Sequence, residues 1–159
     1  MNTINTLKKY RPEILGVILC VSLGFLSGYL SQSGDTEWYL SLQKPPFNPP
    51  SWIFAPVWTV LYIMMGIALA KLWRDRQQRK LLLSLFAVQL ILNLLWTPLF
   101  FYFHRIDLAL MDISLLWISL AIFLTVALKV RTVYWLFSPY FLWVSFAWVL
   151  NYSIYTLNI

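Results

Sequence analysis

Charged residues are scarce in this chain, and histidine and cysteine occur once each. Only 11% of the 159 residues are charged and 60% are hydrophobic, whereas an average soluble domain has about 25% charged residues. The surface is therefore not built to face water. Cys20 cannot form a disulfide within the chain, and with His104 expected in a loop no internal metal site of the ordinary type can be assembled. The sequence also lacks a nucleophile–base pair, a carboxylate dyad and a glycine-rich phosphate loop, which leaves acid–base catalysis without candidates.

The sequence contains several long apolar runs. A membrane-spanning helix needs roughly 20 apolar residues, and five such runs predict helices at about residues 13–32, 53–73, 81–103, 107–129 and 133–157. The first run is longer than the core of a signal peptide and no small-x-small cleavage site follows it, so we interpret it as a retained helix. The prediction is an all-α fold, a single integral membrane domain over residues 1–159 with five transmembrane helices in the lipid bilayer.

The placement of basic residues predicts how the chain crosses the membrane. Five crossings put the N-terminus and the second and fourth connecting loops on one side. That side carries ten of the twelve basic residues: Lys8, Lys9, Arg11, Lys71, Arg74, Arg76, Arg79, Lys80, Lys129 and Arg131. By the positive-inside rule the N-terminus is expected in the cytoplasm and the C-terminus outside. The loop with Asp35 and Glu37 would face outward, and the net charge of +6 is not interpreted as a nucleic-acid signal.

The first connecting loop, residues 33–52, is rich in proline and aromatic residues. Five of the eight prolines fall between positions 45 and 56, and the loop 33–52 contains Trp38, Phe47 and Trp52. Proline removes an amide donor and clashes with the preceding helical turn, so we expect a stiff and extended loop. Such a loop between two spanning helices predicts a lid, or one wall of a binding site for a flat hydrophobic ligand.

Three predicted helices carry stripes of aromatic and amide side chains. Residues spaced by three or four positions share one helix face, which groups Gln89, Asn93, Trp96 and Phe100; Tyr140, Trp143, Ala147 and Asn151; and Trp58, Tyr62 and Met65. Amides that faced lipid would lack hydrogen-bond partners, so the stripes should converge inside the bundle. They predict an interior ligand cavity. The alternative is that the amides only join helices, by hydrogen bonds of about 0.6–2 kcal/mol each.

Four single positions carry local expectations. Gly24 and Gly28 have the spacing of a close-packing motif, which we assign to a contact within the bundle in preference to a dimer seam. Asp107 is expected to cap the fourth helix. Asp112 is the one acid inside a spanning run, and we expect it to reach the interface or to cap a neighbouring helix; a proton or ion relay is the alternative.

Several motifs, in order along nearly the whole chain, resemble one known family. They are Trp38-Tyr39, Lys44-Pro45-(x2)-Asn48-Pro49-Pro50-(x)-Trp52, Pro56-(x)-Trp58-Thr59-(x2)-Tyr62, Asn93-(x2)-Trp96-Thr97-Pro98-(x)-Phe100-Phe101 and Pro139-Tyr140-(x2)-Trp143. The chain resembles the tryptophan-rich sensory protein/translocator protein (TspO/MBR) family. The resemblance implies a five-helix bundle, usually a homodimer, with a site beneath the first loop for porphyrins such as protoporphyrin IX or haem.

The resemblance also implies which residues bind the ligand. Transferred position by position, the candidates are Trp38, Phe47, Trp52, Trp58, Tyr62, Asn93, Trp96, Trp143, Ala147 and Asn151. No cofactor or metal is required, and a porphyrin would be held as a ligand without ligation of a central iron. The short C-terminus resembles bacterial members, which favours a bacterial plasma membrane. No Lys or Arg follows Tyr152 and Tyr155, so the cholesterol motif of animal members is incomplete.

The resemblance is compatible with three functions. The favoured one is a membrane receptor or sensor that binds porphyrins and links them to tetrapyrrole or stress regulation. The second is an enzyme that degrades porphyrins with light and oxygen, in which Trp58 and Trp143 would be the catalytic residues. The third is a transporter of porphyrins or other small apolar solutes, which the absence of a detectable internal repeat disfavours.

Overall fold

The computed structural model describes residues 3–33, 36–74 and 79–159. Its elements are α1 Thr3–Leu30, α2 Glu37–Ser41, the 3-10 helix η1 Ser51–Ile53, α3 Phe54–Arg74, α4 Arg79–Thr97, the π-helical turn η2 Pro98–Tyr102, α5 Ile106–Ala127 and α6 Arg131–Leu157. Within these ranges five helices, α1, α3, α4, α5 and α6, are long and apolar enough to cross a membrane. The predicted all-α membrane bundle is confirmed.

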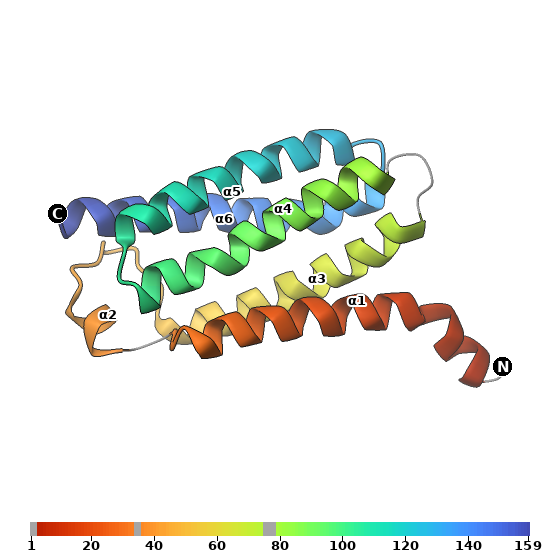
Figure 1. The fold of residues 1–159 in the computed structure, drawn as a ribbon, viewed down its shortest axis with the longest axis horizontal. Helices are drawn as coiled ribbons and strands as arrows, with labels where there is room; N and C mark the ends of the chain where they lie inside the picture. The colour runs from red at the N-terminus through yellow and green to blue at the C-terminus, as the bar shows by residue number, and fades with distance from the viewer. Residues whose placement is uncertain (1–2, 34–35, 75–78) are drawn as a thin grey trace.

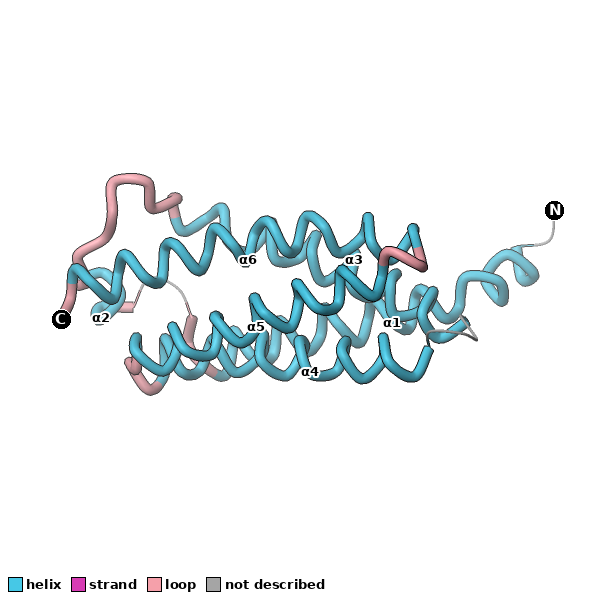
Figure 2. The backbone as a smooth tube through the Cα atoms, turned by 90° about the horizontal axis from the view of Figure 1, so that it is seen from above, coloured by secondary structure: helices cyan, strands magenta, loops and turns pink. Residues whose placement is uncertain are grey.

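The five long helices lie side by side and alternate in direction (Figures 1 and 2). α1 packs against α3, α3 packs against α6, and α5 contacts both α4 and α6. The start of α1, the end of α3, the start of α4 and the α5–α6 connection lie at one end of the bundle, whereas α2 and the C-terminus lie at the other (Figure 1). Arg76 and Asp35 lie outside the described residues, as do the side chains of Lys8 and Arg79.

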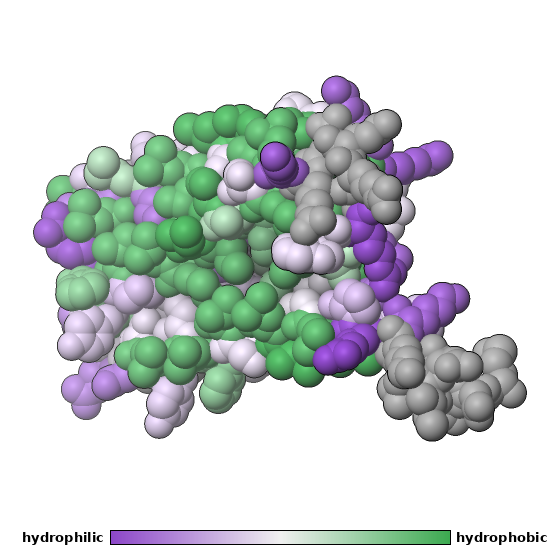
Figure 3. Space-filling view, turned by 45° about the vertical axis from the view of Figure 1, so that its right-hand side comes forward, coloured by the Kyte–Doolittle hydropathy of each residue, from purple (hydrophilic) through white to green (hydrophobic). Residues whose placement is uncertain are grey.

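The surface is suited to lipid. In Figure 3 apolar side chains cover the middle of the visible face, and hydrophilic ones gather toward its ends. Large apolar side chains such as Ile18, Phe25 and Leu142 are exposed along the long helices. Soluble monomers rarely expose contiguous apolar patches larger than a few hundred Å², so this belt fits the hydrocarbon of a bilayer.

The first helix begins earlier than expected. α1 starts at Thr3, not at residue 13, and contains Pro12. The Arg74 guanidinium at the end of α3 donates to the Lys9 carbonyl at 2.9 Å and to both carboxylate oxygens of Glu13 at 2.8 and 3.1 Å. These bonds hold the turns on either side of the proline against α3, so a contact distant in sequence supports the helix through Pro12.

Short helical turns occur where the sequence predicted only loop or uninterrupted helix. α2 lies in the first connecting loop, where the Thr36 hydroxyl accepts a hydrogen bond from the Tyr39 amide and caps the helix. α4 ends at Thr97, and Pro98 opens the π-helical turn. Proline has no amide to continue the α-helical pattern, which accounts for the change of hydrogen bonding at this point.

Two expectations for acidic residues are wrong. α5 begins at Ile106 with Arg105 in the cap position, and the Asp107 carboxylate accepts hydrogen bonds from the Arg105 guanidinium at 2.8 and 2.6 Å instead of capping the helix. Asp112 neither reaches the interface nor caps a neighbouring helix. Its residue is only 7% exposed, and Oδ2 has no hydrogen-bond partner in the described part of the chain.

α1 and α3 touch through their backbones. A Cβ atom on Gly16 would collide with the carbonyl of Gly66, and a Cβ on Gly66 would collide with the backbone of Val17. Gly24 leaves room for the ring of Tyr62, which confirms the contact within the bundle for that glycine. Small residues allow membrane helices to approach this closely, and here they bring α1 against the helix that carries Tyr62.

We expect Gly66→Ala to lower the midpoint of thermal unfolding in detergent. The new methyl group meets the backbone of α1, which cannot move aside as a side chain can, and overpacking of this kind costs about 1–3 kcal/mol. Gly28→Ala is the matched control, because its Cβ would meet only the Ser33 hydroxyl, at 3.1 Å. Equal midpoints for the two variants, measured by circular dichroism, would contradict the tight α1–α3 contact.

Candidate functional site

Two hydrogen bonds join amide side chains to aromatic rings across helices. The Tyr62 hydroxyl of α3 donates to Oδ1 of Asn93 on α4 at 2.6 Å, and Nε1 of Trp96 on α4 donates to Oδ1 of Asn151 on α6 at 2.8 Å. Both asparagines are buried, so the inward direction predicted for these amides is confirmed. The alternative interpretation, that the amides only join helices, also holds for Asn93 and Asn151, because each side chain bonds a residue on a neighbouring helix.

Aromatic rings line the interior between α3 and α6. The ring of Trp58 lies 5.8 Å from Tyr62 and 6.1 Å from Tyr140, measured between centroids, and Phe54 meets Trp143 edge-on at 6.0 Å. Edge-to-face pairs of this kind contribute about 0.5–1.5 kcal/mol beyond burial. The stripes predicted on α3 and α6 therefore do face each other. We call these five rings, Phe54, Trp58, Tyr62, Tyr140 and Trp143, the aromatic wall.

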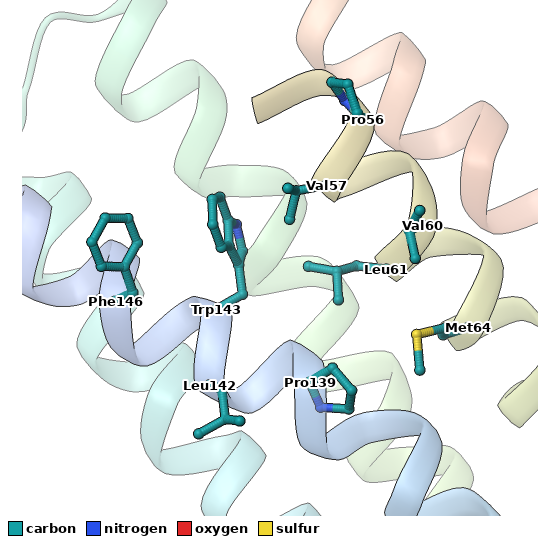
Figure 4. A pocket seen from close by; sticks show the side chains of 9 residues that line it. All are labelled: Pro56, Val57, Val60, Leu61, Met64, Pro139, Leu142, Trp143 and Phe146. Carbon is teal, nitrogen blue, oxygen red and sulfur yellow. The ribbon is translucent and has the colours of Figure 1, made fainter. Parts of the chain in front are cut away.

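A groove of about 570 Å³ runs along the junction of these two helices (Figure 4). It is lined from α3 by Pro56, Val57, Val60, Leu61 and Met64, and from α6 by Pro139, Leu142, Trp143 and Phe146. Val60 and Leu142 are exposed, whereas Leu61 is buried. The groove thus opens sideways, where lipid would lie, and has its floor inside the bundle. Its volume is within the range of about 300–1,000 Å³ that small-molecule sites occupy.

Trp143 connects the groove with the aromatic wall. Its ring stands between α6 and Val57 in Figure 4, and it packs on Phe54 and Phe146. Its indole nitrogen Nε1 is buried and has no hydrogen-bond partner among the residues that the structure describes. Buried indole donors usually find a partner. Trp143 therefore presents ring carbon atoms to the groove, while its one polar atom lies buried behind this surface without a partner.

The first connecting loop is attached to the bundle at two points. Trp38 stacks on His104 at 4.1 Å and meets Phe100 edge-on at 5.5 Å. Farther along, Gln43 exchanges two backbone hydrogen bonds of 2.9 Å with the side chain of Asn158, just after α6. The loop is therefore held against the ends of α4 and α6, where a lid over the site would have to be anchored.

The structure brings together only some of the predicted site residues. Trp143 lines the groove, while Trp58, Tyr62 and Asn93 lie in the contacts behind it, and Trp96, Ala147 and Asn151 belong to the packed interior. Trp38 lies at the loop attachment. The other two loop residues, Phe47 and Trp52, are 48% and 74% exposed and take no part in the buried wall.

Most of the groove residues were not expected from the sequence. On α6, Pro139, Leu142, Trp143 and Phe146 do share one helix face, and this spacing was the available signal. The signal is weak, because apolar residues that face a groove and apolar residues that face lipid obey the same pattern. Only the position of α3 against α6 distinguishes the two.

The lining suits binding and offers no group for acid–base chemistry. Neither a charged side chain nor a histidine or cysteine lies among the groove residues. The described residues also contain no cluster of three His, Cys, Asp or Glu side chains that could hold a metal ion. What the groove provides is apolar surface and aromatic faces.

Comparison with known proteins identifies the family. The sequence profile of the TspO/MBR family matches residues 16–157. The tryptophan-rich protein TspO of Chlorobaculum tepidum is 41% identical over 145 residues, covering 88% of this chain and 91% of the relative. Protein CrtK of Rhodobacter capsulatus is 41% identical over 128 residues, covering 76% and 78%. The translocator protein of Bos taurus is 37% identical over 159 residues, covering 91% and 89%. The chain therefore belongs to the TspO/MBR family.

Proposed function

We propose that this protein is a membrane receptor for porphyrins, such as protoporphyrin IX or haem, and for similar planar apolar ligands, and that binding is linked to tetrapyrrole or stress regulation. The observation that carries the proposal is the apolar groove of about 570 Å³ between α3 and α6, with the Trp143 ring in its wall. Family membership supports the proposal, as does the name of a relative, the tryptophan-rich sensory protein of Cereibacter sphaeroides, which is 36% identical over 125 residues.

The physical match is between a flat, largely apolar ring and an apolar slot with one donor. Protoporphyrin partitions into lipid, and a groove that opens between α3 and α6 can admit a ring directly from the bilayer. Inside, the ring stacks on Trp143. The indole N–H is buried in this structure, and it donates to a polar atom of the ligand, such as a carboxylate oxygen, once the lining side chains move apart on ligand entry. The lining residues include no histidine, cysteine or tyrosine, so we infer that the protein recognises the shape and surface of the ring and not its metal.

We expect Trp143→Phe to weaken protoporphyrin IX binding by about three- to tenfold, because it removes the hydrogen bond and part of the stacking surface. Binding is measured in the dark by saturable quenching of tryptophan fluorescence in detergent micelles. Trp135→Phe is the matched control on the same helix, since Trp135 is exposed and does not line the groove. An unchanged Kd for Trp143→Phe, or a larger loss for Trp135→Phe, would count against the proposed site.

Repeating the titration under illumination separates a receptor from a light-dependent enzyme. If the protein is a receptor, the absorption spectrum of the bound porphyrin is the same with and without illumination, once the bleaching of free porphyrin is subtracted. A new absorbing product that forms only with protein, light and oxygen, and that Trp143→Phe abolishes, would assign the groove to porphyrin degradation instead.

Filling the groove provides a test that leaves every tryptophan in place. Val60→Phe projects a larger side chain into the groove, so we expect at least about tenfold weaker binding of protoporphyrin IX, as expected when a site of this size loses most of its contact area. Val149→Phe introduces the same residue at an exposed position of α6 outside the groove and should bind as the parent does. If the two variants bind equally well, the ring lies elsewhere.

The positive-inside rule supports a cytoplasmic N-terminus, because the basic connections lie at the N-terminal end of the bundle. The two ends of α3 allow a test in a Cys20→Ala background, with Trp52→Cys and Trp73→Cys; both tryptophans are exposed. In intact bacteria a membrane-impermeant maleimide should label position 52 directly and position 73 only after lysis. The opposite pattern would invert the proposed orientation.

A further inference from the structure

A second groove lies between α5 and α6, at the end of the bundle where these two helices connect (Figure 1). Its volume is about 410 Å³, within the range of small-molecule sites. Leu124 and Leu128 line it from α5 and its C-terminal cap, and Trp135 and Phe141 line it from α6. Leu128 and Trp135 are exposed, whereas Leu124 and Phe141 are half-buried. The groove therefore opens sideways, toward the surrounding membrane.

The lining of this second groove is mostly apolar. Its two small hydroxyl groups donate to backbone carbonyls of their own helices, Ser138 to Tyr134 at 2.8 Å and Thr125 to Ile122 at 2.7 Å. The residues that line the groove include no charged side chain. Such a surface suits a hydrocarbon chain, which needs contact area and no hydrogen bonds.

The groove also has nearly the length of one membrane leaflet. Along α6 it runs from Tyr134 to Leu142, eight residues apart, which is about 12 Å of helix at about 1.5 Å per residue. The hydrocarbon of one leaflet is about 15 Å thick, half of the roughly 30 Å of a bilayer core. Tyr134 meets Trp135 edge-on at 5.3 Å near the start of α6, and such aromatic residues gather at the level of the headgroups. An acyl chain that begins at that level fits along the groove.

Two basic side chains lie at the mouth of the groove without an acidic partner. Lys129 and Arg131 belong to the connection between α5 and α6, and both are exposed. Neither forms an ion pair with a residue that the structure describes, whereas Arg74 at the same end of the bundle is held by Glu13 at 2.8 Å. Residues 113–159 contain no Asp or Glu. The positive charge at the mouth of the groove is therefore available to an anion from outside the protein.

The start of α6 adds to this positive charge. Val130 occupies the cap position and supplies no side-chain cap. The backbone amides of Val133 and Tyr134 donate to the Val130 carbonyl, but those of Arg131 and Thr132 have no hydrogen-bond partner in the described part of the chain. Unpaired amides at the start of a helix, together with the helix dipole, favour an anion.

We propose that an acidic phospholipid binds in this groove, with its phosphate at Lys129 and Arg131 and one acyl chain along Trp135 and Phe141. Such a lipid matches both parts of the site, because it combines an anionic headgroup with a hydrocarbon chain. A zwitterionic phospholipid would bring an ammonium group to the same two cations. Inorganic phosphate would pair with the cations but would make no contact with the groove.

The lipid site does not depend on the receptor function. Leu142 lines both grooves, so the two lie on neighbouring faces of α6 with this side chain between them. The porphyrin would occupy the face toward α3, and the phospholipid would occupy the face toward α5. Lipid binding is therefore measured without porphyrin, and its failure would leave the receptor proposal untouched.

Native mass spectrometry from neutral detergent micelles tests the headgroup contact. With phosphatidylglycerol the protein should form a one-to-one complex at least about tenfold tighter than with phosphatidylcholine, and Lys129→Ala/Arg131→Ala should abolish this preference. Lys9→Ala/Arg11→Ala is the matched control, because it removes one lysine and one arginine, both exposed, from α1 at the same end of the bundle. Equal affinity of the parent protein for the two lipids overturns the proposal. An equal loss in both double variants would show attraction by net charge alone and overturn it too.

Filling the groove tests the acyl-chain contact while every charge stays in place. Ser138→Phe puts a ring into the groove, and because the Ser138 hydroxyl bonds only its own helix, no other side chain loses a partner. We expect at least about fivefold weaker binding of phosphatidylglycerol, since the acyl chain loses contact area. Val149→Phe, exposed on the same helix and outside both grooves, should bind as the parent does. Unchanged binding by Ser138→Phe, or release of the lipid by inorganic phosphate at the same concentration, would overturn the proposal.

Discussion

The hydrocarbon of a bilayer offers no hydrogen-bond partner, and this constraint decides which way the polar side chains of the bundle point. Asn93 and Asn151 lie inside because only other helices can satisfy them, and each holds an aromatic ring from a neighbouring helix. The ring of Tyr62 is thereby fixed beside Trp58 in the aromatic wall between α3 and α6, and the ring of Trp96 is fixed against Phe100 and Phe101. Against this background, the buried Nε1 of Trp143 is an exception, because it has no partner among the described residues.

Much of the fold follows from the sequence, because the length and polarity of the apolar runs are set by the bilayer. The five spanning helices and the inward direction of Asn93 and Asn151 depend only on that environment. Features that depend on particular neighbours were not predictable. α1 extends through Pro12 because Arg74, distant in sequence, binds the turns around it. The Asp107 carboxylate binds the Arg105 guanidinium, and Arg105, not Asp107, occupies the cap position of α5.

The candidate site, like the fold, could be predicted from the sequence only in part. The stripe on α6 predicted that Trp143 faces the interior side of the bundle, yet the groove itself depends on how far α3 stands from α6. Val60 and Leu142 look like any lipid-facing residues in the sequence. Phe47 and Trp52 were expected in the loop wall from the resemblance and are exposed. The loop is nevertheless attached to the bundle at two points, Trp38 and Gln43.

The central claim is that a planar ligand lies between α3 and α6 against Trp143. A structure of the protein in a lipid bilayer with bound protoporphyrin IX tests this claim most directly. The account predicts density for the ring in the groove, with a polar ligand atom within hydrogen-bond distance of Nε1 of Trp143. A ring bound between other helices, with the groove between α3 and α6 filled by lipid and Nε1 still without a partner, would contradict it.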